Sequence, residues 1–202
     1  MPGTLWSAPV PALNNNSAVF SPATATLTDI SPAQVIINPP QLNTGTRVRL
    51  FAQGSYIATT TASSITLGFY MTAASTATAA NNLVATSAVL GAGPSTAVGA
   101  VTASWMAMYW GVITKMSSPV IGLTNATIVG RGIVQWQTAV GGAFSQLAIP
   151  QTVAAATVAQ TGTPGFGMVT NIAQLVSIGA TVAVNTGLTS ITTDELTCEL
   201  LG

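Results

Sequence analysis

The sequence predicts an all-β protein, an antiparallel β-sandwich of jelly-roll type preceded by an extended N-terminal arm. Short segments rich in Val, Ile, Thr and aromatic residues alternate between apolar and polar side chains, which is the period of a half-buried strand. Turn residues separate these segments, and few stretches carry helix signals. About eight to ten strands in one chain are typical of two packed sheets.

Composition divides the chain into an arm, residues 1–24, and one domain, residues 25–202. The arm contains prolines and an asparagine run without a sustained period, whereas no charged or Pro/Ser-rich linker interrupts the rest. The arm also has apolar side chains that we expect to lie on a surface, either of their own domain or of a neighbouring protein: Leu5, Trp6, Val10, Leu13 and Phe20. We expect the arm to contact the proteins among which this chain assembles.

The first half of the domain predicts five strands, at residues 25–30, 33–38, 46–56, 64–72 and 83–90. Pro39 and Pro40 end the second strand, because proline cannot donate to a sheet ladder. Alternation in the third and fourth strands predicts buried side chains at Val48, Leu50, Ala52, Tyr56, Ile65, Leu67, Phe69 and Met71. Arg47 and Arg49 then share the opposite face of the third strand, where we expect them to protect a sheet edge from aggregation or to form a small polar contact.

The strand predicted at residues 103–114 differs from the others because both of its faces are apolar. Such a strand must be covered twice, either by a loop or by another subunit. Its aromatic and methionine side chains therefore predict a subunit interface: Trp105, Met106, Met108, Tyr109 and Trp110.

The second half of the domain predicts further strands at residues 124–138, 175–184 and 191–201. Gly130 and Gly132 predict a β-bulge or a close approach of two backbones in the first of these. Residues 151–160 are ambiguous, because Ala favours helix whereas Val and Thr favour strand. In the last strand, alternation turns Leu196, Cys198 and Leu200 inward, which makes Cys198 a buried, inert thiol.

The low number of charges argues against several classes of function. The chain has 4 Lys+Arg, 4 Asp+Glu and no His, which is 4% charged residues against about 25% in a typical domain. No general base, metal site or cofactor site is evident, and so few cations do not suit binding to nucleic acid. The charges are also scattered along the sequence, so we expect no charged patch.

The lengths of the apolar runs and the character of the first residues indicate where the protein is expected to be found. Thr, Ser, Asn, Gly or Pro interrupts each apolar run before about 20 residues, so the sequence predicts no membrane partner. The N-terminus lacks a basic segment followed by an apolar one, so we expect synthesis in the cytoplasm. With no net charge to keep copies apart, we expect the chain to assemble into something larger.

Residues 24–32 (TATLTDISP), 45–54 (GTRVRLFAQG) and 65–71 (ITLGFYM) resemble the first strands of small jelly-roll proteins encoded among the structural genes of tailed actinobacteriophages. The later segments 104–110, 130–136 and 176–184 fit the same order. The resemblance implies a homotrimer that decorates, or cements, the exterior of the virion capsid by binding the major capsid protein. The alternative is a receptor-binding or carbohydrate-binding module of a tail or head fibre, for which aromatic side chains grouped in a groove would argue.

Overall fold

A computed structural model describes residues 5–6, 28–32, 35–37, 43–58, 64–73, 83–86, 101–115, 127–137, 143–155, 174–184 and 188–201. This part of the chain consists of antiparallel β-strands with short turns and contains no helix. It therefore also contains no helix that could span a bilayer. The all-β prediction is confirmed for the described residues.

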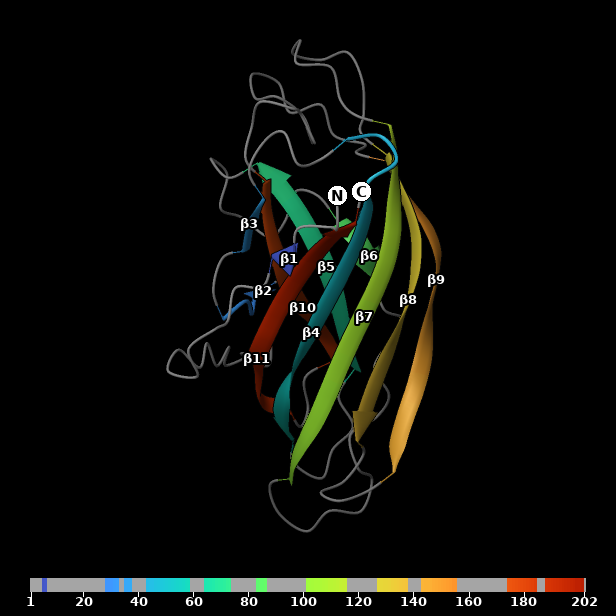
Figure 1. The fold of residues 1–202 in the computed structure, drawn as a ribbon. Helices are drawn as coiled ribbons and strands as arrows, with labels where there is room; N and C mark the ends of the chain where they lie inside the picture. Colours follow the sequence, from blue (N-terminus) through green and yellow to red (C-terminus); the bar gives the residue numbers. More distant parts are fainter. Residues whose placement is uncertain are drawn as a thin grey trace.

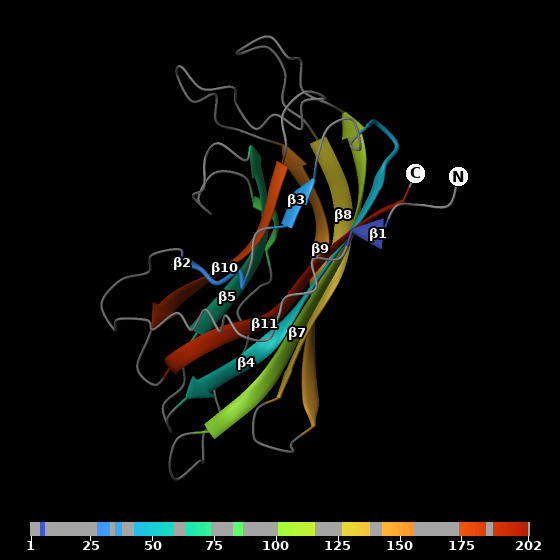
Figure 2. The same cartoon turned by 60° about the vertical axis from the view of Figure 1, so that its left-hand side comes forward.

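The strands form two antiparallel sheets (Figure 1). The six-stranded sheet has the order β1 (Leu5–Trp6), β11 (Leu188–Leu201), β4 (Arg47–Ala58), β7 (Val101–Lys115), β8 (Thr127–Gln137) and β9 (Phe144–Ala155). The five-stranded sheet has the order β2 (Thr28–Asp29), β10 (Gln174–Val184), β5 (Ser64–Ala73) and β6 (Leu83–Thr86), and β3 (Val35–Ile37) also pairs with β10. The turned view in Figure 2 separates the two layers.

One hydrophobic core joins the two sheets, because buried side chains from both belong to a single cluster. The predicted alternation is confirmed at the described inward positions. The six-stranded sheet contributes Val48, Leu50, Trp105, Tyr109, Ile128, Val134, Leu196 and Cys198, and the five-stranded sheet contributes Ile65, Leu67, Phe69, Val176, Ile178 and Ala180. β4, β7, β8 and β11 thus bury one face and keep the second face of the six-stranded sheet outside, whereas residues 67–70 of β5 and 176–180 of β10 are buried at every position.

Strand β9 is not predicted as a strand, because the sequence leaves residues 139–150 unassigned and residues 151–160 ambiguous between helix and strand; residues 151–155 are strand in the structure. Its polar side chains and Pro150 do not indicate a strand, because proline is normally excluded from the middle of a sheet. β9 is the last strand of its sheet in the described chain, and an edge strand tolerates proline. Its register against β8 shifts between Gly130 and Gly132, so the predicted irregularity at these glycines is confirmed.

The arm enters the described structure only at β1. Leu5 lies opposite Glu199 and Trp6 opposite Cys198, so these two residues add a short strand to the chain's own six-stranded sheet. The other predicted anchors, Val10, Leu13 and Phe20, lie outside the described residues.

Gly54 allows β4 to approach β11 beside the largest buried side chain. Asp194 is the extra residue of a bulge in β11, where the register shifts between Thr193 and Glu195. Trp105 lies opposite Gly54 on β7, and its indole N–H donates a hydrogen bond of 3.2 Å to the Thr192 carbonyl oxygen. A Cβ atom at Gly54 would collide with that same carbonyl group, so the bulge and the Trp105 contact both require glycine.

We expect Gly54→Ala to lower the free energy of unfolding by about 3 kcal/mol, because the neighbouring strand would have to move to accept the methyl group. Urea unfolding of the two proteins measures this difference. The matched control is Ser104→Ala on the exposed side of β7, which should change stability by less than about 0.5 kcal/mol. Equal unfolding midpoints for Gly54→Ala and the wild type would show that the close approach is not a real constraint.

Candidate functional site

The face of the six-stranded sheet that points away from the core is the candidate site, and we call it the outer face. The pairing register arranges its side chains in rows that cross the strands β11, β4, β7 and β8. Directly opposite side chains on neighbouring strands have Cβ atoms about 4.5–5.5 Å apart, so each row brings its members into contact range. Two adjacent rows contain the large apolar and the charged side chains on which the functional interpretation of this face depends.

The first row is apolar. Phe51 lies opposite Met108, and Met108 lies opposite Ile133. All three are half-buried although they face away from the core. Such a row on a sheet surface offers apolar area to a partner without the need to open the fold.

The second row, called the arginine row, consists of Glu199, Arg49, Trp110 and Arg131 in that order across the sheet. Arg49 Nη1 lies 3.0 Å from Glu199 Oε2, and the two side chains are 48% and 26% exposed. At this exposure an ion pair contributes about 0–1 kcal/mol to stability, so its main effect is to orient the guanidinium group. Trp110 is 40% exposed between two arginine positions, an arrangement that suits stacking of a guanidinium group on the indole.

The charges are scattered along the sequence, as expected, but several of them are brought onto one sheet by strand pairing. Five of the eight charged residues of the chain lie at outward positions of the paired strands, on the outer face: Arg47, Arg49, Arg131, Glu195 and Glu199. Arg49 and Glu199 are 150 residues apart in the sequence, a separation that local patterns do not connect. Edge protection by Arg47 and Arg49 is wrong, because β4 lies between β11 and β7 and is not an edge strand.

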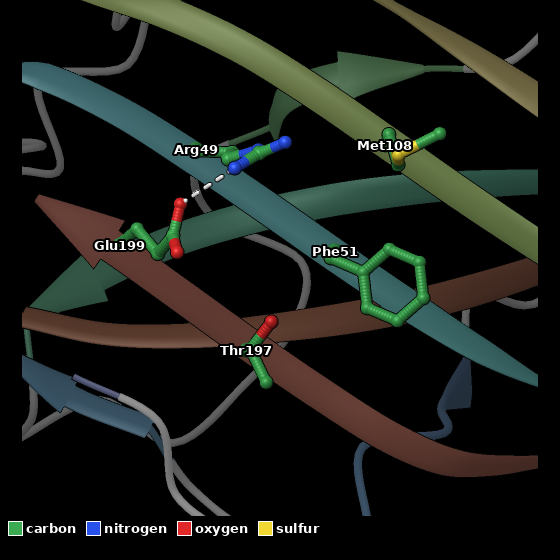
Figure 3. Close-up of a pocket in the computed structure, with 5 residues that line it drawn as sticks. All are labelled: Arg49, Phe51, Met108, Thr197 and Glu199. Atoms are coloured by element: carbon green, nitrogen blue, oxygen red, sulfur yellow. Dashed lines mark hydrogen bonds and ion pairs between the residues drawn. The ribbon is translucent and has the colours of Figure 1, made fainter. Parts of the chain in front are cut away.

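A shallow depression of about 290 Å³ lies where the two rows meet, and Figure 3 shows its lining residues, Arg49, Phe51, Met108, Thr197 and Glu199. They come from three neighbouring strands, β4, β7 and β11. The only carboxylate in the lining already accepts a hydrogen bond from the only guanidinium group. This composition suits an apolar or amphipathic side chain of a partner better than proton transfer to a substrate.

The predicted interface residues of β7 divide between the two faces. Trp105 and Tyr109 are 1% and 0% exposed within the single chain, so their side chains belong to the core and cannot meet another subunit. Met106, Met108 and Trp110 lie on the outer face. Of the two apolar faces predicted for this strand, one is thus covered by the core of the same chain.

Several apolar side chains that are exposed or half-buried in the structure are not predicted as such from the sequence. Phe51 shares its strand face with Arg47 and Arg49, so the alternation that placed the arginines also contained the signal for Phe51. Phe144, 52% exposed, had no such signal because its strand was not predicted. Val112 and Leu201 are also exposed, at 38% and 44%, and both lie opposite Arg47.

Among the described residues, no group of three or more His, Cys, Asp or Glu side chains could hold a metal ion. No family model matches the chain, and no curated protein or solved structure matches it.

Cys198 lies beneath the outer face, where its side chain is fully buried as predicted. Burial, with a smaller contribution from the negative charge of Glu199, raises the pKa of the thiol from 9.0 to about 12. At pH 8 the thiol is both protonated and inaccessible. Neither condition suits a nucleophile.

We expect Cys198 to resist Ellman's reagent at pH 8 in the folded protein and to react at once in denaturant. Because the folded state holds the thiol proton more tightly, the contribution of this group to stability is full below pH 9 and is lost as pH rises toward 12. Cys198→Ala should therefore show a shallower loss of stability over that range in urea titrations. Rapid labelling of the native protein would contradict the buried position.

Proposed function

We propose that this chain is a non-enzymatic structural protein of a phage virion, a homotrimer that decorates and stabilises the capsid exterior by binding the major capsid protein. The observation that carries the proposal is the outer face, on which Trp110, Val112 and Leu201 are exposed beside half-buried Phe51 and Met108. A chain with eight charged residues in 202 has too little charge to keep such an apolar face soluble when it is exposed to water. Contact with other protein copies removes it from water.

The composition of the outer face supports a protein partner. Aromatic residues, methionine and arginine are enriched in protein interfaces, and Trp and Arg are frequent among the residues that dominate binding energy. The outer face combines these types in adjacent rows: Phe51, Met106, Met108, Trp110, Arg49 and Arg131. A broad sheet face with a shallow depression suits a protein surface better than a small molecule.

A jelly-roll sandwich is the form of the fold that we propose. The supporting feature is the nested order of the antiparallel pairs, in which β4 pairs with β11, β5 with β10, and β7 with β8. β6 and β9, which complete this order, also contact each other. A double-stranded ribbon folded over itself gives such nested pairs, and this is how a jelly roll is built.

The alternative, a receptor-binding or carbohydrate-binding module of a tail or head fibre, has weaker support. Sugar sites on β-sheet proteins need aromatic rings grouped with polar side chains. In the described chain the most exposed rings, Trp110 and Phe144, lie on different strands with β8 between them, and the depression has a single ring, that of Phe51. The resemblance in residues 24–71 also implies decoration of the capsid.

The test is an image of particles produced from the genome that encodes this chain, beside particles from a mutant in which the gene is deleted. Cryo-electron microscopy should show trimeric density on the capsid exterior that is absent from the deletion mutant. The deletion particles should also release DNA at a lower temperature. Density at a tail or fibre would instead establish the alternative function, and unchanged capsids would contradict decoration.

Substitutions at two neighbouring residues of β7 should distinguish an effect on assembly from an effect on folding. Trp110→Asp should dissociate the trimer at micromolar concentration in sedimentation velocity while its circular dichroism spectrum stays that of the wild type, because the side chain lies outside the core. Tyr109→Ala should instead lower the free energy of unfolding by about 3–5 kcal/mol, because it empties a fully buried site. A trimeric Trp110→Asp variant would exclude the outer face as the assembly surface.

A further inference from the structure

Four charged side chains on strands β4, β8 and β11 of the six-stranded sheet lack an ionic partner of opposite sign within the described chain. Arg47 and Arg131 are exposed cations, and the one ion pair among the described residues joins Arg49 to Glu199. Asp194 is an exposed anion, and Glu195 accepts a hydrogen bond of 2.8 Å from the Gln53 amide, which is neutral. Two cations and two anions thus remain without charge compensation on one sheet.

These cations and anions cannot neutralise each other within one subunit. Arg131 is on β8 and Glu195 is on β11, three strand spacings away, and their rows are four residues apart along the strands. At about 4.8 Å per strand and 3.3 Å per residue, the two positions are roughly 20 Å apart. Their opposite charges can therefore meet only between two copies of the chain or across a contact with another protein.

The backbone position of Arg131 is fixed by the close approach of β8 to β7. Gly130 and Gly132 flank it, and a Cβ atom at either glycine would collide with a carbonyl oxygen of β7, from Trp110 or Met108 respectively. The core residue Tyr109 fills the space beneath Gly130 from the inner side. Close approach of β7 and β8 thus fixes the backbone of Arg131 opposite Trp110, with its side chain exposed.

The acidic pair lies at the opposite side of the sheet. β1 pairs with β11 only at Cys198 and Glu199, so in the described chain no strand covers the edge of β11 next to Asp194 and Glu195. The bulge at Asp194 turns this stretch out of the regular ladder and presents both carboxylates. We call Asp194 and Glu195 the acidic edge, and Arg47, Trp110 and Arg131 the basic patch.

We propose that the basic patch of one subunit binds the acidic edge of a second copy of the chain, with Arg131 paired to Glu195. The proposal rests on the homotrimer of the proposed function. A closed ring of three requires a head-to-tail contact in which two different patches of the same chain meet. The separated charges of opposite sign supply such patches, and the exposed indole of Trp110 supplies the apolar part of the contact.

Sedimentation equilibrium of charge-reversal variants tests this contact on the full-length protein. Arg131→Glu and Glu195→Arg should each weaken trimer formation about tenfold or more, because each places like charges against each other. The double variant Arg131→Glu/Glu195→Arg should restore association to within about threefold of the wild type, because it recreates the pair with reversed signs. Restoration also shows that neither single change acts by unfolding the subunit.

The matched control compares two substitutions that change the net charge equally. Arg131→Gln should weaken the trimer, whereas Thr44→Glu, in the exposed turn before β4, should leave it unchanged. Single variants that trimerise like the wild type, or a double variant no better than the singles, would overturn the contact while leaving the trimer itself standing. A monomeric wild type would instead overturn the proposed trimer, and loss of capsid binding by Arg131→Glu with an intact trimer would assign the basic patch to the capsid protein.

Discussion

The two-residue period of β7 is the constraint on which both faces of the six-stranded sheet depend. Its inward side chains include Trp105 and Tyr109, the two largest fully buried residues, and its outward ones include Met108 and Trp110. A slip of one residue would exchange the two sets and put the core aromatics into water. Gly130 and Gly132 oppose such a slip, because each lies against a backbone carbonyl oxygen of β7 at a position where a larger residue would collide.

The six-stranded sheet has few charged side chains, and they differ in whether a partner of opposite charge lies beside them. Arg49 has Glu199 as its partner, while Arg131 has no partner of opposite charge among the described residues. Surface pairs of this kind add little to folding stability. They restrict how a partner can be oriented, because an apolar surface alone does not fix the register of two contacting faces. We therefore assign binding strength to the apolar row and orientation to the charged groups.

Local periodicity predicted much of the fold but not the composition of the site. Alternation placed Val48, Leu50 and Leu196 inward, and it also contained the position of Phe51. It could not show that Glu199 lies beside Arg49 or that Trp110 lies between two arginines, because those neighbours come from strand pairing over long sequence separations. β9 escaped prediction because an edge strand may contain proline and polar residues without a clear alternating pattern.

The central claim, that the outer face is where copies of this protein assemble, is tested most directly by hydroxyl-radical footprinting with mass spectrometry. Oxidation of each side chain is compared between dilute protein and protein concentrated until it associates. Met106, Met108 and Trp110 should lose reactivity on association, while Tyr109 should be protected at both concentrations because it lies in the core. Unchanged oxidation of the three outer residues in the associated protein, or protection confined to the five-stranded sheet, would contradict the claim.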